Sequence, residues 1–517
     1  MARTPVRDGQ FAGFAGGVNR TADPFALAND QLRQAKNIRV SRIGGILKRD
    51  GGYVYAADDA PTTSGVTGGF MSRSAEGDYI LLVDAGGLYT SELDGMDAWD
   101  NPTITLSTNA KARFAQFIDG AGDEVVYIAD GGLLNKWACA TGTATADIAS
   151  TPSCTVLKVH NQRLYGAGDP AAPDSLFYSA LNNGDTLGIG ASQGGQIVVR
   201  TFGDSKILAL ASYRESLYIF HEQGISRLTG FGQDDTEVSP EGVSGVIGIM
   251  AIDSIVETDD GVYFVTSQGV FIVNDGGVQR LGSASRPDPV AEYIAATPTV
   301  EGFTILGAYS RRTSEVMVSI FGHGTYVLNL ITRTWTGPWD GPWSRLMVMV
   351  EAVESSQSVV REALLGVTTE DFLTNVITIL DVPEYIRDDS TYGDITTGTN
   401  FTLTAQFRRA DFGDVTTSKS LRWGFFTGYF PANSDVTVAW ETDRTAAQYT
   451  LSTPPGGIWD DELDWDETLV WGPAGYRQYR IPMCKNGYFV DVIITDGNAF
   501  RTEISRFVMD AYTLGIR

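Results

Sequence analysis

The chain has 517 residues and a formal net charge of −25, from 63 acidic and 38 basic side chains. A single hydrophobic core rarely serves more than about 250 to 300 residues, so the length predicts at least two units. The acidic balance argues against binding nucleic acid, because Lys and Arg side chains hold its phosphates.

The apolar pattern of the chain predicts neither export nor a membrane span. Residues 1–16 lack the apolar stretch of an export signal, and no later window approaches about 18 consecutive apolar residues. The three cysteines, Cys139, Cys154 and Cys484, have no metal-ligand spacing. We expect idle or buried thiols in a reducing compartment, although a Cys139–Cys154 disulfide stays open.

Residues 1–52 are interpreted as an N-terminal arm and docking segment. Within it, residues 30–36 are compatible with one short helical turn or with a loop. A basic cluster follows in an otherwise acidic chain, and its candidate interface residues are Asn37, Arg39, Lys48 and Arg49. We expect these residues to dock on an acidic neighbouring subunit, where charged pairs fix the register of the contact.

Residues 53–385 contain a repeat that predicts a β-propeller. Its unit is a short apolar strand, a turn rich in Gly or Asp, and a second short strand. The first strands lie roughly 38 to 53 residues apart, as four strands per propeller blade require. They begin at Tyr79, Val126, Leu164, Leu217, Val262, Val316 and Leu364. About seven blades follow from this count. Asp-Gly, Gly-Gly, Gln-Gly and His-Gly pairs supply residues that tolerate positive φ at the hairpin turns.

Residues 386–517 are predicted to form a C-terminal β-sandwich. A polar connection over residues 388–400 precedes short strands that alternate with turns. The fold class predicted for the chain is therefore all-β, with a propeller of about seven blades followed by a sandwich.

Few residues of the chain suggest catalysis, so the sequence predicts that it is not an enzyme and needs no cofactor or metal. The three histidines, His160, His221 and His323, lie far apart, and no nucleophile motif accompanies them. The tract from Trp459 to Trp471 combines acids with tryptophans, which are ingredients of glycan binding or hydrolysis. Its candidate residues are Trp459, Asp461, Trp465 and Asp466. A loop on the sandwich, anchored by its tryptophans and with its acids facing water or a basic neighbouring subunit, is the preferred interpretation of the tract.

Two stretches of the sequence resemble tail proteins of tailed bacteriophages. Residues 34–51 contain Asn37-Ile-Arg39 and then Gly45-Ile-Leu47-Lys48-Arg49-Asp50-Gly51. This is similar to the phrase that introduces the propeller in tail nozzle, tail-tube and DNA-stabilisation proteins, except that Asp50 stands where that family usually has Pro. Residues 410–413, 419–422, 489–494 and 503–505 resemble the end of the same proteins.

The resemblance implies a structural virion protein of the phage tail. It implies a ring of probably six copies below the head-tail adaptor, lining or closing the channel for genome exit. The protein is then expected in the host cytoplasm during assembly and in the virion tail afterwards. DNA passes without specific binding, and an acidic wall that repels phosphate fits this role.

Two rival functions are weighed against the tail role. The first is a carbohydrate-recognising or depolymerising propeller that uses the tryptophan tract on host-surface glycans. The second is a generic protein-interaction propeller of a cell, which the absence of Trp-Asp or kelch signatures disfavours.

Overall fold

The chain forms strands almost throughout the part that the structure describes. The computed structural model describes residues 5–41, 44–54, 66–92, 99–107, 111–188, 194–203, 205–230, 240–283, 286–296, 305–320, 323–340, 346–354, 359–370, 374–382, 401–412, 416–430, 434–452, 475–497 and 503–513. Across these ranges the helices are α1 (Pro289–Ala296) and the 3-10 turn η1 (Gly184–Thr186). No helix there has the length and apolar character needed to cross a membrane. The all-β prediction is confirmed.

Small antiparallel sheets follow one another along the middle of the chain. The described residues form seven successive strand groups. They are β7 (Val66–Ser74), β8 (Gly77–Asp84) and β9 (Gly87–Glu92); β10 (Arg113–Ile118), β11 (Glu124–Ala129), β12 (Asn135–Ala138) and β13 (Ala144–Thr145); β14 (Val156–His160), β15 (Arg163–Asp169), β16 (Ala172–Tyr178) and β17 (Gly195–Val198); β18 (Ile207–Tyr213), β19 (Ser216–His221), β20 (Ile225–Thr229) and β21 (Glu241–Ser244); β22 (Ala251–Thr258), β23 (Gly261–Thr266), β24 (Gly269–Asn274) and β25 (Gly277–Arg280); β26 (Ile305–Ser310), β27 (Glu315–Ile320), β28 (Gly324–Asn329) and β29 (Thr334–Trp339); and β30 (Leu346–Glu354), β31 (Val359–Glu370) and β32 (Thr374–Val382), which β6 (Gly51–Val54) completes.

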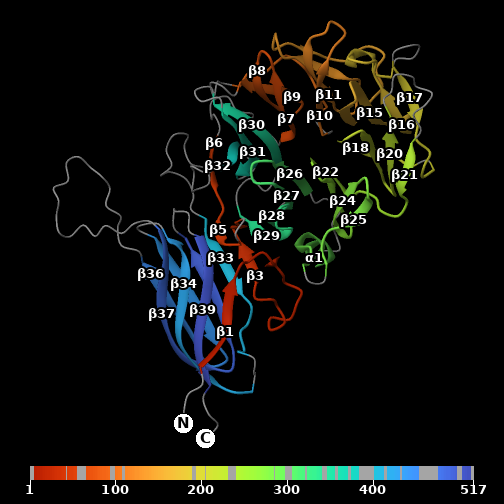
Figure 1. The fold of residues 1–517 in the computed structure, drawn as a ribbon. Helices are drawn as coiled ribbons and strands as arrows, with labels where there is room; N and C mark the ends of the chain where they lie inside the picture. Colours follow the sequence, from red (N-terminus) through yellow and green to blue (C-terminus); the bar gives the residue numbers. More distant parts are fainter. Residues whose placement is uncertain are drawn as a thin grey trace, which may run out of the picture.

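The first strands of these groups contact one another in a closed circuit. Each of β7, β10, β14, β18, β22 and β26 contacts the next, and β30 contacts both β26 and β7. Figure 1 shows the groups arranged around a common centre. Apolar side chains fill the spaces between neighbouring groups, as where Val83 of β8 shares a cluster with Val126 and Trp137. Neighbouring sheets therefore supply one another's core, as expected for structural repeats.

Glycine sets the turns where the sequence predicted it. Gly269 follows Gln268 and has φ +115°, and Gly324 follows His323 and has φ +99°. A Cβ at Gly269 would lie 2.5 Å from Asp288 Oδ2, so both backbone conformation and space require glycine there. These turns reverse the chain between adjacent strands.

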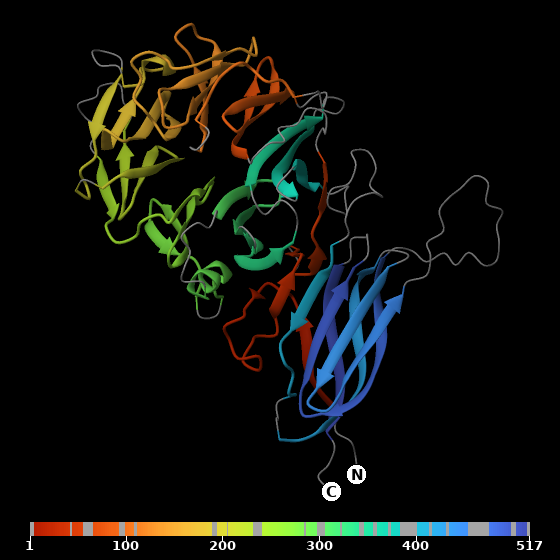
Figure 2. The same ribbon diagram turned by 180° about the vertical axis from the view of Figure 1, so that it is seen from behind.

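Two further sheets pack face to face at the other end of the molecule (Figures 1 and 2). Aromatic rings from the two sheets meet between them: the ring centres of Phe11 and Phe407 are 5.1 Å apart, and those of Phe407 and Phe507 are 5.7 Å apart. One sheet contains β4 (Ile38–Val40), β5 (Ile46–Lys48), β39 (Glu503–Thr513), β34 (Lys419–Phe430) and β37 (Gly475–Gly487), with β1 (Pro5–Ala12) also on β39. The other contains β2 (Gly17–Val18), β3 (Gln31–Lys36), β33 (Leu403–Phe407), β38 (Val490–Asp496), β35 (Asp435–Thr442) and β36 (Ala446–Ser452).

The first 54 residues form strands in both parts of the molecule. β1 to β5 belong to the two facing sheets, and β6 pairs with β32 of the circuit. β3 also pairs with β29 through Ala35 and Gly337, so one sheet runs continuously from the circuit into the facing pair. Residues 1–52, interpreted from sequence as an arm, thus contribute β1 to β5 to the two facing sheets and the start of β6 to the circuit. The expected boundary near residue 385 lies outside the described residues.

The three cysteines differ in their expected reactivity. All are free thiols, so the Cys139–Cys154 disulfide is not formed; Cys139 and Cys154 are buried, whereas Cys484 is exposed. Burial raises the pKa of the Cys154 thiol to about 12 and also raises that of Cys139. Because the thiolate is the reactive form, we expect an aromatic disulfide reagent to modify Cys484 alone at neutral pH. Peptide mapping after labelling tests this, with denatured protein as the control; rapid native labelling of Cys154 would contradict it.

Candidate functional site

The basic cluster predicted as an interface lies in the interior of the chain. Asn37 is fully buried, and Arg39, Lys48 and Arg49 are 7%, 2% and 3% exposed. They lie on or beside β4 and β5, next to the end of β29. A docking role for these four residues stays a prediction, while the structure gives them partners within their own chain.

Arg39 is held by two buried carboxylates. Its Nε lies 3.0 and 2.9 Å from the two carboxylate oxygens of Glu315 on β27, and its Nη1 lies 3.0 Å from Asp50 Oδ2. Glu315 is 1% exposed and Asp50 is 4% exposed. The guanidinium also lies 5.1 Å from the ring centre of Trp339. Asp50, which departs from the tail-protein pattern, is thus a counter-ion of Arg39.

Asn37 and Arg49 tie the N-terminal strands to two distant segments. Asn37 adopts φ 53°, donates to the Thr402 carbonyl at 2.8 Å and accepts from the Asp340 amide at 2.7 Å. Arg49 donates to the Asp340 carbonyl at 2.6 Å and stacks on Phe401 at 3.7 Å. Lys48 lies 4.9 Å from the same ring. We call the set formed by Asn37, Arg39, Lys48, Arg49, Asp50 and Glu315 the N-terminal junction, because it fixes both parts of the molecule to residues 37–50.

The glycan alternative is not addressed by the structure. Trp459, Asp461, Trp465 and Asp466 lie outside the described residues. Two of the predicted structural histidines are buried: His160 Nδ1 lies 2.8 Å from Ser212 Oγ, and His221 Nε2 lies 2.8 Å from Ser226 Oγ. Burial lowers the pKa of both imidazoles.

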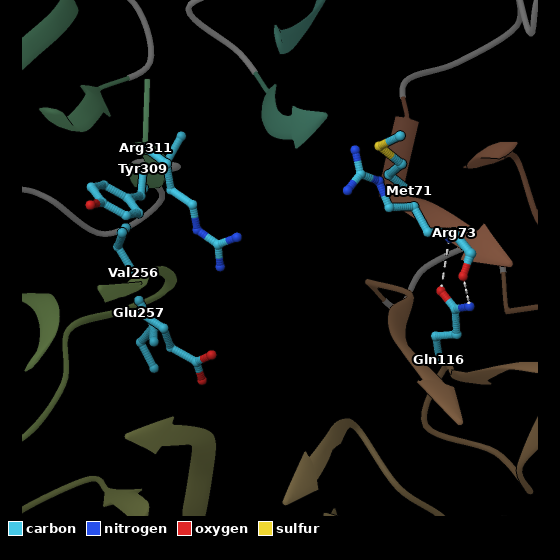
Figure 3. A pocket seen from close by; sticks show the side chains of 10 residues that line it. Met71, Arg73, Gln116, Val256, Glu257, Tyr309 and Arg311 are labelled. Atoms are coloured by element: carbon cyan, nitrogen blue, oxygen red, sulfur yellow. Dashed lines mark hydrogen bonds between the residues drawn. The ribbon is translucent and has the colours of Figure 1, made fainter. Parts of the chain in front are cut away.

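A pocket of about 450 Å³ opens at the centre of the circuit. Figure 3 shows Arg311 and Glu257 on one side of it and Arg73 and Gln116 on the other. Gln116 of β10 accepts from the Arg73 amide at 3.0 Å and donates back to the Arg73 carbonyl, which joins β7 to β10. Glu257 Oε2 accepts from Lys158 Nζ at 2.6 Å, and its Oε1 accepts from the Ser212 amide at 2.6 Å.

Ion pairs also cross the centre between groups that are not neighbours. Lys111, and Arg113 of β10, pair with Asp253 of β22, and Lys158 of β14 pairs with Glu257 of β22. These pairs connect the second and third strand groups to the fifth. The sequence reasoning missed all of these residues because its apolar anchors lie in the second strand of each observed group. Charged residues in or next to the first strand of each group were the available signal.

The polar groups at the centre serve mainly to hold the sheets together. Glu257, the acidic side chain lining the pocket, is already bonded to Lys158 and to the Ser212 amide. Among the described residues, no group of three or more His, Cys, Asp or Glu side chains is placed to hold a metal ion. The arrangement offers a polar pocket, and its geometry nominates no reaction.

The fold defines an all-β protein built from small antiparallel sheets. No protein-family model and no curated protein matches the chain. Among solved structures it is similar to the extracellular domain of a putative hybrid two component system from B. thetaiotaomicron, with 12% identity and a TM-score of 0.41 over 64% of this chain and 39% of that one. It is also similar to PorZ, a bacterial surface component of the type-IX secretion system of Porphyromonas gingivalis, with 11% identity and a TM-score of 0.43 over 82% of this chain and 60% of that one. The chain thus spans less than two thirds of the length of either protein.

Proposed function

We propose that this chain is a structural protein of a bacteriophage tail, a ring-forming nozzle or tube component that lines or closes the channel for genome exit. In this proposal the closed circuit of seven strand groups is a seven-bladed β-propeller, with β6 completing the last blade. The two facing sheets are the β-sandwich behind it. About six copies surround the tail axis and contact the head-tail adaptor or other tail proteins.

The observation that carries the proposal is the place of the tail-protein-like phrase in the fold. Asn37, Arg39 and Arg49 belong to that phrase, and they bind Thr402, Glu315 and Asp340 at the junction of the two parts. Proteins that share an architecture are expected to retain the residue types that hold this architecture together. The resemblance therefore rests on groups that organise the fold.

The charges at the centre of the circuit bear on where DNA passes. Lys111 and Arg113 pair with Asp253 across the centre, and Lys158 pairs with Glu257. A duplex does not fit through a passage bridged by such contacts. In the proposal the genome channel is consequently formed between copies, and its wall is the acidic surface of several chains, which repels phosphate.

The test is cryo-electron microscopy of phage particles from a culture that makes the protein, labelled with an antibody against residues 400–517. We expect label around the tail axis, in a number that gives the copy count. A matched antibody against a head protein serves as the control. Protein found free, with no particle labelled, would refute the tail role. A glycan array comparing the natural chain with Trp465→Ala would then test the carbohydrate alternative.

A further inference from the structure

The outer face of the sheet that contains β34, β37 and β39 carries an unusual set of side chains. Buried and accessible residues alternate along β34, so that Leu421 and Phe426 point into the core and Phe425 is accessible from outside. β39 alternates in the same way, with Phe507 and Met509 buried and Val508 half-buried. The register places Phe425 between Arg480 of β37 and Val508 of β39. Two half-buried apolar side chains, Phe425 and Val508, thus lie side by side on the solvent side of this sheet.

The guanidinium groups of two arginines on this face lie over aromatic rings. The Arg480 guanidinium lies 3.4 Å from the ring centre of Trp423, and that of Arg422 lies 4.9 Å from the ring centre of Tyr512. Both arginines are exposed, and neither makes an ion pair with any residue in the described ranges. A stacked guanidinium keeps its N–H edges outward, where they match a carboxylate in a two-pronged hydrogen bond. We call Arg422, Trp423, Phe425, Arg480, Val508 and Tyr512 the arginine face.

The arginine face is positively charged on a chain of net charge −25. The outward positions of β39 also include Arg506. The acids on the same strand are Glu503 and Asp510. A polyanion such as nucleic acid is an unsuitable partner, because the rest of the chain repels it. An acidic protein surface can pair with the arginines and cover Phe425 and Val508.

This chain itself supplies such a surface at the circuit of strand groups. In three groups the turn that joins the first strand to the second carries an exposed acid, and in the sixth group it carries the exposed Arg311 and Arg312. The turn of the fourth group also carries Arg214, which pairs with Asp275. The acids are Asp123, Glu215 and Asp259. We call these three residues the acidic rim.

We propose that the arginine face docks on the acidic rim of a second copy of this chain. The contact is heterologous, since two different surfaces meet, and repetition of a heterologous contact generates a ring when the rotation closes. The inference rests on the proposed function, for which it names the surface that joins one subunit to the next.

The test measures self-association of the full chain by sedimentation velocity over a range of protein and salt concentrations. We expect association that weakens as salt rises, because charge pairs carry part of it. The double variant Arg422→Glu with Arg480→Glu should associate about a hundredfold more weakly, since each lost pair costs about a factor of ten. Arg200→Glu with Arg444→Glu is the matched control, because it makes the same charge change at two exposed arginines outside both proposed surfaces. The control should associate slightly more weakly at most.

A cross-linking experiment identifies the partner surface. Cys484 is the exposed thiol and lies on β37 close to Arg480, so a photoreactive maleimide attached there reports on what covers the arginine face. We expect cross-links to peptides that contain the acidic rim. Equal association of the double variant and its control, a chain that stays monomeric throughout, or cross-links confined elsewhere would overturn the inference. The antibody labelling of phage particles is unaffected by any of these results, so the two proposals fail separately.

Discussion

Replacing Arg39 with alanine should destabilise the protein by about 3 to 5 kcal/mol, because it leaves buried carboxylates without their counter-ion. Glu315 and Asp50 both bind Arg39 and are almost fully buried. The free energy of unfolding from urea denaturation, followed by tryptophan fluorescence, measures the loss. The control is Arg214→Ala, because Arg214 pairs with Asp275 on the surface, where the side chains are 64% and 52% exposed. That change should cost less than about 1 kcal/mol.

A second variant separates charge burial from lost packing in this experiment. In the Arg39→Ala background, Glu315→Gln removes one of the uncompensated charges, so part of the stability should return. No recovery would mean that the loss comes from the Arg39 contact with Trp339. A loss for Arg39→Ala no larger than that of Arg214→Ala would show that the N-terminal junction does not hold the fold together.

Replacing Phe407 with alanine should cost about 3 to 5 kcal/mol, the usual price of removing a buried aromatic ring from a close-packed core. Phe407 is fully buried on β33 and lies 5.1 Å from Phe11, 5.5 Å from Phe14 and 5.7 Å from Phe507. It therefore joins the N-terminal segment to both facing sheets. Thermal unfolding by calorimetry measures the effect, and limited proteolysis should show faster cleavage near β1.

Tyr449→Ala is the matched control for Phe407, because Tyr449 is an aromatic residue 38% exposed on β36. A surface change of this kind is usually within about 0.5 kcal/mol of neutral. Phe407→Leu keeps most of the buried volume and should fall between the two variants. Equal melting temperatures for Phe407→Ala and Tyr449→Ala would contradict the assignment of Phe407 to the shared core.

Local pattern predicted much of the middle of the chain because its hairpins are local. The apolar anchor beginning at Val126 lies in β11, and that beginning at Val262 lies in β23. The turns at Gly269 and Gly324 have the positive φ that their sequence pairs require. In each hairpin both strands and the turn lie within about 20 residues, so a short window contains the information that forms it.

The local pattern did not predict the strand near the N-terminus, because that strand depends on long-range pairing. Residues 30–36 were compatible with a helical turn or a loop, yet residues 31–36 form β3. β33, more than 360 residues away in the chain, supplies the partner strand, with Ala35 opposite Ala405. Tertiary pairing of this kind overrides local propensity, and no window of the sequence around β3 contains it.

The charges of residues 37–50 were recognised from the sequence, and their position was not. An Arg in an acidic chain reads as a surface cation, because charged side chains are seldom fully buried without a partner. Arg39 has its partner at Glu315, 276 residues further along the chain, and the sequence does not reveal that pairing. The arginine face was missed for a related reason, since the stacking of Arg480 on Trp423 depends on strand register.

The sequence alone determined that this protein is all-β, built from short strands with glycine turns, and strongly acidic. Those properties depend on composition and on contacts between near neighbours. Only the tertiary structure decided that the first 54 residues knit both parts together and that the basic cluster is internal. It also decided that Arg422 and Arg480 stand together on one face. The first two features arise from pairing between residues hundreds of positions apart, and the third arises from the register between β34 and β37. Burial, which decides whether a charged side chain faces solvent or holds the fold together, is a property of the assembled fold.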